Sequence, residues 1–113
     1  MIELIILEYL QSVFSVPVYA EKPSAPPPKY IVIERTGTQV LNRITSATIN
    51  VQSNAETLYE AALLNEDVIA AMQEAVTLNN ISHVSLTSAY NYTDTDTKQP
   101  RYQAVFYIVY YKE

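Results

Sequence analysis

The residues best suited to acid–base chemistry lie in one short polar segment of the last third of the chain. His83 is the only histidine, and Ser85 and Thr87 follow it at alternate positions, so the three share one face of an expected strand. A histidine can activate a hydroxyl group, but acid–base work or metal binding normally needs companion groups close by. The segment supplies none, so we interpret His83 as a solvent-facing strand residue and expect no catalytic residue.

A second candidate for chemistry is the pair Asp94 and Asp96. Alternate aspartates can chelate a hard cation such as Ca²⁺. The segment lacks the glycine, the further acidic positions and the terminal glutamate of an established calcium loop. We therefore expect no metal site here and interpret residues 93–100 as a solvated turn.

Other catalytic and cofactor-binding arrangements are missing from the sequence. The chain has no cysteine, which excludes disulfides, thiolate metal sites and cysteine catalysis, and its single glycine excludes a glycine-rich phosphate loop. The acidic pairs Glu56/Glu60 and Glu66/Asp67 fit the solvated face of a helix. The sequence therefore predicts a protein that is not an enzyme and holds no cofactor.

Composition predicts one folded domain spanning residues 1–113. Hydrophobic residues make up 49% of the chain, which is enough for a core, and the net charge of -5 argues against general nucleic-acid binding. Ten tyrosines accompany two phenylalanines and no tryptophan. Tyrosine combines a large contact area with a polar tip, which suits half-buried strands and protein interfaces.

The N-terminal apolar stretch is interpreted as a helix rather than a targeting segment. It has no Lys or Arg before Lys22 and contains Glu3 and Glu8, unlike a secretory signal. No stretch reaches the roughly 18 apolar residues of a membrane span. We expect a soluble chain made in the cytoplasm.

Periodicity predicts the elements of the first half of the chain. The apolar stripe of the N-terminal helix comprises Ile2, Ile5, Ile6, Tyr9, Leu10 and Val13. We expect a helix over residues 2–14, a short strand over 16–20, and strands over 29–36 and 41–52. Residues 22–28 form a proline-rich connector, preferred over a ligand for a proline-binding domain. Gly37 is expected to supply a positive φ in the turn between the second and third strands.

The second half is expected to contain one helix and two strands. Ser53 and Glu56 form a capping box that predicts a helix running to about residue 76 or 77. Its expected apolar stripe comprises Leu58, Ala62, Ile69, Met72 and Val76. Strands are expected over residues 81–92 and 101–112, with Val84, Leu86, Tyr90 and Tyr92 on one side of the first. The order α-β-β-β-α-β-β predicts an α+β fold with a mostly antiparallel sheet and the helices on one face.

The last expected strand has apolar residues on both faces. One face carries Ala104, Phe106 and Ile108, and the other carries Val105 and Tyr107. A strand with one solvated face should alternate apolar and polar residues, so this strand is expected to be covered on both sides. A chain of this length has little material for a second cover, which suggests a partner subunit.

Three segments in this order resemble a known family. They are Val16-Pro17-Val18-Tyr19 with the residues 27–34 that follow, residues 47–61, and residues 90–95 with Lys98 and residues 101–106. The chain resembles the small tail terminator, or tail-to-head joining, proteins of bacteriophages with long non-contractile tails. The likeness spans nearly the whole chain and rests on pattern and segment order rather than on a catalytic signature.

The resemblance implies a structural protein of the virion neck, assembled in the host cytoplasm. Such subunits form a ring, usually a hexamer, that caps the last ring of tail-tube protein and presents a surface to the head connector. Partners would be other copies of the chain, the tube protein and neck proteins, while DNA only passes through the channel and no membrane is involved. The negative charge suits such a channel, and a strongly basic channel wall in an assembled ring would contradict that hypothesis.

Exposure patterns identify the candidate contact residues. These are Tyr90, Tyr92, Asp94, Asp96, Lys98 and Arg101 in and beside the turn, Tyr107 and Tyr111 on the last strand, and Arg35 and Arg43 as partners for the acidic helix face. Two alternatives remain open. The chain could be another neck component, such as a head-completion or adaptor protein, or a tail-tube subunit. It could also be a soluble domain that binds a small ligand or a peptide.

Overall fold

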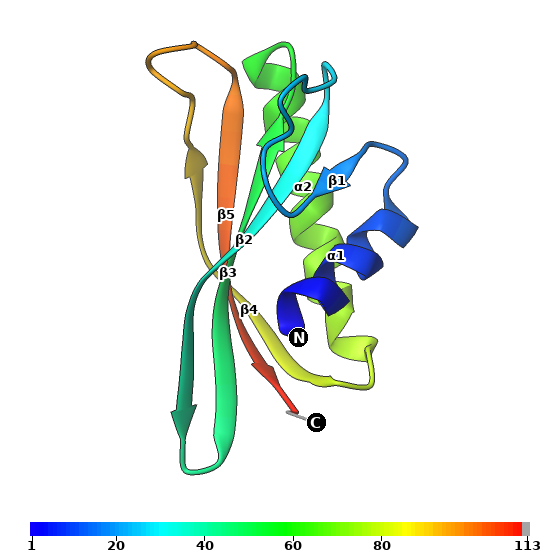
Figure 1. Ribbon diagram of the computed structural model, residues 1–113, viewed down its shortest axis with the longest axis vertical. Coiled ribbons are helices and arrows are strands. Elements are labelled where there is room, and N and C mark those ends of the chain that lie inside the picture. The colour runs from blue at the N-terminus through cyan, green and yellow to red at the C-terminus, as the bar shows by residue number, and fades with distance from the viewer. Residues whose placement is uncertain (112–113) are drawn as a thin grey trace.

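Two helices pack on one side of a five-stranded sheet. The computed structural model describes residues 1–111 (Figure 1). Helix α1 (Ile2–Val13) and strand β1 (Val18–Tyr19) precede the long strands β2 (Tyr30–Leu41) and β3 (Ile44–Asn54). Helix α2 (Leu58–Glu74), the 3-10 turn η1 (Ala75–Thr77) and strands β4 (Ile81–Asn91) and β5 (Arg101–Tyr110) complete the fold. The predicted α+β class and element order are confirmed.

The sheet order is β1-β2-β3-β5-β4, and only the β1–β2 pair is parallel. Helix α1 lies against β1 and β2, whereas α2 lies across β3, β5 and β4. The core between these layers is built from alternate residues of the strands and one stripe of each helix. Its fully buried members include Ile6, Leu10, Ile33, Ile49, Val68, Met72, Phe106 and Ile108.

The β2–β3 hairpin differs from the prediction. Gly37 lies inside β2 without a positive φ, next to a bulge where Thr36 is the extra residue. The turn instead falls at Asn42 and Arg43, whose φ values are 52° and 67°. Positive φ at both central residues is the mark of a type I′ two-residue turn, in which asparagine is well tolerated. The expected turn at Gly37 is therefore wrong, and the hairpin is longer than predicted.

The capping box also lies elsewhere. Ser53 pairs with Ile31 and Tyr102 within the sheet, so it cannot cap a helix. Thr57 is the N-cap of α2, and its Oγ1 accepts a hydrogen bond from the Glu60 amide at 3.1 Å. The Thr57 hydroxyl also donates to Glu60 Oε1 at 3.1 Å. A second Ser/Thr-x-x-Glu pattern four residues downstream thus starts the helix.

Helix stripes agree with the prediction only in part. In α1, the predicted Ile2, Ile6 and Leu10 are buried, while Val13 is 51% exposed. In α2, Met72 is the only predicted stripe residue that is buried. The stripe that contacts the sheet comprises Ala61, Leu64, Asn65, Val68, Ala71 and Met72. The predicted stripe favoured the largest apolar residues, whereas the face that contacts the sheet also includes alanines and Asn65.

Bulges in β4 overturn the predicted single-sided pattern of that strand. Register shifts at Ser82 and Thr87 each insert one residue relative to β5. Leu86 pairs with Phe106 and faces the helices, whereas Tyr90 pairs with Gln103 and faces away. Each extra residue changes the side on which the following side chains lie. The predicted strand 101–112 corresponds to β5, and Lys112 is outside the described residues.

Candidate interaction surface

The sheet side that faces away from the helices brings several predicted contact residues together. Because Ala104, Phe106 and Ile108 are buried against the helices, the intervening residues of β5 and their partners face the other way. We call this surface the open face, and it comprises Tyr90, Tyr92, Arg101, Gln103, Val105, Tyr107 and Val109. Both helices lie on the opposite side of the sheet (Figure 1). Four of the ten predicted contact residues therefore share one surface.

A hydrogen-bonded row orders one end of the open face. Gln52 Nε2 donates to Gln103 Oε1 at 3.1 Å, and Gln103 Nε2 donates to the Tyr90 hydroxyl at 2.6 Å, which links β3, β5 and β4. The rings of Tyr90 and Tyr92 meet edge to face at 5.9 Å. The Arg101 guanidinium lies 4.6 Å from the centre of the Tyr92 ring and donates to the Tyr92 carbonyl at 2.8 Å. These side chains are held in place before any partner binds.

The other end of the open face has one apolar row on β5, which is flanked by polar residues of β3 and β4 such as Thr48 and Ser85. Val105 and Val109 are half-buried, and Tyr107 between them is 39% exposed. Tyr107 borders a hollow of about 170 Å³ beside the β2 bulge, where no atom lies within 4 Å of the position that a Gly37 Cβ would take. Tyr111, just after β5, is 64% exposed. The two-sided strand thus has one side filled by the helices and another that still presents apolar surface.

The turn over residues 93–100 is organised by its own aspartate. Asp94 Oδ1 accepts hydrogen bonds from the amides of Asp96 at 2.8 Å and Thr97 at 3.3 Å, and the Asp94 carbonyl accepts from the Lys98 amide at 2.7 Å. The bonds from the Asp96 and Thr97 amides hold the pKa of Asp94 below its usual value. Asp96 and Lys98 point into solvent, and Lys98 has a φ of 58°. Asp94 therefore shapes the turn, leaving Asp96 and Lys98 as its exposed charges.

Arg35 and Arg43 lie away from the open face. Arg35 Nε pairs with Glu3 Oε2 at 2.9 Å and joins β2 to α1 on the helical side of the sheet. Arg43 occupies the tip of the β2–β3 hairpin and is exposed. Arg35 is thus paired within its own chain, whereas the sequence suggested that it contributes to charge pairs between subunits.

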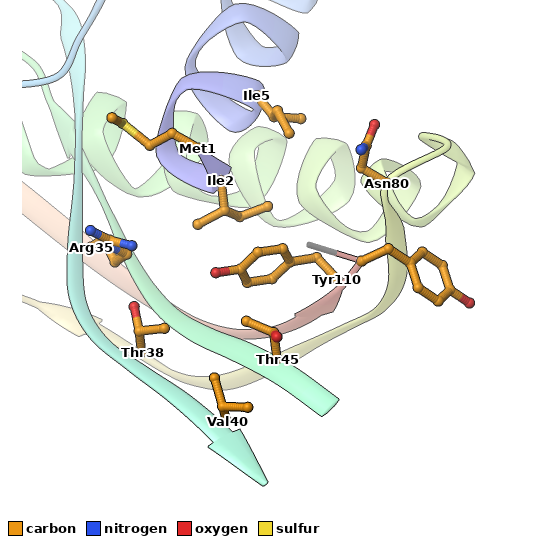
Figure 2. A pocket seen from close by; sticks show the side chains of 10 residues that line it. Met1, Ile2, Ile5, Arg35, Thr38, Val40, Thr45, Asn80 and Tyr110 are labelled. Carbon is orange, nitrogen blue, oxygen red and sulfur yellow. The ribbon is translucent and has the colours of Figure 1, made fainter. Parts of the chain in front are cut away.

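A pocket of about 370 Å³ lies between the start of α1 and the inner side of the hairpin (Figure 2). Met1, Ile2 and Ile5 line it from the helix, and Val40 and Tyr110 are among the residues that line it from the sheet. Its volume is within the range of small-molecule sites. No predicted catalytic group lies in it.

The residues considered for acid–base chemistry and for metal binding lie on β4 and on the turn over residues 93–100. His83 is exposed on the open-face side of β4 opposite Val109, Ser85 lies opposite Tyr107, and Thr87 falls at a bulge. Among residues 1–111, no three His, Cys, Asp or Glu side chains form a group that could hold a metal ion. The search for membrane-spanning helices over the same residues finds none.

Sequence reasoning missed Gln52 and Gln103, which together with Tyr90 link β3, β5 and β4. For Gln103 the signal was present, because a glutamine near the start of an otherwise apolar strand needs a hydrogen-bonding partner. Comparison of the chain with models of known protein families gives no match, and comparison with curated proteins gives none.

Proposed function

We propose that the chain is a ring-forming structural subunit that closes the end of a bacteriophage tail tube and joins it to the head connector. The observation that supports this most is the open face, an ordered surface of tyrosines, an arginine and half-exposed valines. Aromatic residues and arginine are the types enriched at the centres of protein interfaces. The resemblance of segments 16–34, 47–61 and 90–106 to tail terminators supplies the biological context.

The open face has the features of a contact with another subunit or with the tube. Tyr90 and Tyr92 are 40% and 43% exposed and already ordered by Gln103 and Arg101. Covering them would remove apolar area from water with little further loss of side-chain freedom. On this proposal the protein acts through binding alone.

Deletion of the gene from the parent phage tests the proposal directly. Loss of a terminator is expected to give abnormally long, headless tails. Normal tails with unfilled or leaking heads would instead indicate a different neck component. Electron microscopy of the purified protein separates the terminator from a tube subunit, because a tube subunit polymerises into long tubes while a terminator stops at one ring.

The pocket beneath the hairpin supports a second candidate, a small-ligand-binding domain. Its volume is about 370 Å³, and its lining combines apolar residues such as Ile2 and Val40 with polar ones such as Arg35, which fits a small, mainly apolar ligand with a polar group. Binding would raise the melting temperature with ligand concentration. A thermal-shift screen of small apolar compounds tests this, with Ile5→Glu as the variant expected to abolish any shift.

A further inference from the structure

The tip of the β2–β3 hairpin is an exposed apolar projection. Leu41 and Ile44 are 61% and 54% exposed, and Val40 beside them is 61% exposed. The hairpin extends well beyond the helices, which leaves its tip clear of the rest of the chain (Figure 1). A two-residue turn of positive φ fixes the end of the hairpin. A rigid apolar tip of this kind is well suited to insertion into a complementary groove.

The outer side of the helical layer contains such a groove. It lies between the end of α1 and the second half of α2 and has a volume of about 500 Å³. Phe14, Val13 and Ala70 supply apolar lining, and Asp67 and Glu74 add two carboxylates. The Tyr9 hydroxyl donates to the Ala71 carbonyl at 2.7 Å and holds the two helices together across it.

Charge is segregated between the groove and the hairpin tip. The two helices contain no lysine or arginine, and their charged residues are Glu3, Glu8, Glu60, Glu66, Asp67 and Glu74. Between Arg43 and Lys98 the chain has no lysine or arginine. Arg43 is thus a lone positive charge on the apolar tip, and the groove offers negative charge beside apolar side chains. The tip and the groove are therefore complementary in charge, and both present apolar side chains.

We propose that the hairpin tip of one copy docks into the α1–α2 groove of the next copy. Leu41 and Ile44 would pack against Val13 and Phe14, and Arg43 would face the acidic groups of the groove. Within one chain the hairpin extends past the helices at one end of the sheet, which keeps its tip away from the end of α1 (Figure 1). The complementary charge of the groove therefore assigns it to the tip of a second copy.

The contact joins two different surfaces, so each copy keeps one free tip and one free groove. Repetition of such a contact closes into a ring when the rotation between copies allows it. The inference rests on the ring-forming part of the proposed function. It also leaves the open face free for a contact with the tube.

Single-cysteine variants test the contact, because the natural chain has no cysteine. Leu41→Cys places a thiol on the tip, and Ala70→Cys places one in the groove. An equimolar mixture under mild oxidation is expected to give mixed disulfide dimers faster than a mixture of Ala70→Cys with Thr95→Cys, whose thiol lies on the exposed turn. Equal rates in the two mixtures would overturn the proposal. So would dimers formed mainly by Leu41→Cys with itself, which indicate a symmetric tip-to-tip contact.

A charge exchange gives an independent readout on the same reaction. Adding Arg43→Glu to the tip variant is expected to slow mixed-dimer formation about fivefold, the equivalent of about 1 kcal/mol. Adding Asp67→Lys to the groove variant should restore the rate. A rate unaffected by both changes would contradict the assignment of Arg43. Cross-linking needs no tail or phage, so its result stands apart from the outcome of the gene deletion.

Discussion

Phe106 and Tyr107 are neighbours on β5 that face opposite sides of the sheet, and their replacement should separate folding from assembly. Phe106 is fully buried, whereas Tyr107 is 39% exposed on the open face. Replacing Phe106 by alanine is expected to lower the free energy of unfolding by about 3–5 kcal/mol, because it removes buried area and leaves a cavity. Domain stabilities are about 5–15 kcal/mol, so the loss is large.

The Tyr107→Thr variant should be much less destabilised. About three-fifths of Tyr107 is buried, corresponding to roughly 90–150 Å² of a tyrosine's area and about 2–4 kcal/mol of burial. Threonine suits a strand and retains part of this contact, so the expected loss is about 1–2 kcal/mol. At about 4 °C per kcal/mol, the melting temperature should fall by roughly 12–20 °C for Phe106→Ala and by 4–8 °C for Tyr107→Thr.

Urea unfolding followed by circular dichroism measures both values, and sedimentation or electron microscopy measures assembly. Tyr107→Glu and Tyr111→Glu should impair assembly while the monomer remains folded. A Tyr107→Thr variant as destabilised as Phe106→Ala would refute the reasoning. In that case β5 is ordinary core on both sides and the open face is no contact surface.

Three further predictions concern local structure. Thr57→Ala should lower the free energy of unfolding by about 1 kcal/mol in urea titrations, because it removes the N-cap. Ser53→Ala should cost less, since the buried Ser53 hydroxyl has no hydrogen-bond partner among residues 1–111. Tyr9→Phe should cost about 0.5–1.5 kcal/mol at neutral pH through loss of the bond to Ala71. Burial and the charge of Glu74 raise the pKa of Tyr9 above its usual value of 10. The stabilisation by the Tyr9 hydroxyl is therefore full below pH 10 and is lost as the pH rises through the raised pKa. In a pH series, the melting temperature should decline less steeply for Tyr9→Phe than for the natural chain. Arg43→Gly should stabilise the hairpin by about 1 kcal/mol in thermal unfolding, because the φ of 67° at this position is strained for arginine. The same change should weaken association between copies, since it removes the positive charge of the tip. A destabilised Arg43→Gly protein would contradict the type I′ turn.

The sequence was sufficient for the fold class because each long element carries its own period. Alternation in residues 47–51 and the apolar stripe of α1 identify a strand and a helix without knowledge of their neighbours. The two-sided apolar pattern of residues 102–110 predicted a cover on both sides of this strand, and the helices supply one of the two.

Turn and cap positions could not be obtained in the same way. Gly37 and Ser53 both have the residue type of a chain-reversing or capping position, but pairing with neighbouring strands keeps each within the sheet. The bulges at Ser82 and Thr87 are fixed by the match between β4 and β5, so the side on which Tyr90 lies cannot be obtained from β4 alone. Local preference was outweighed by long-range hydrogen bonding.

The same bulges affect what happens when many copies are crowded together. Strand β4 forms one edge of the sheet, and the edge of β2 that faces away from β3 has no neighbouring strand beyond Val32 among the described residues. Unpaired edges invite uncontrolled strand addition and aggregation. Extra residues at Ser82, Thr87 and Thr36 interrupt both edges and disturb the regular spacing of their free amides and carbonyls. At high local concentration, association between copies is therefore determined by side-chain surfaces rather than by the backbone edges of the sheet.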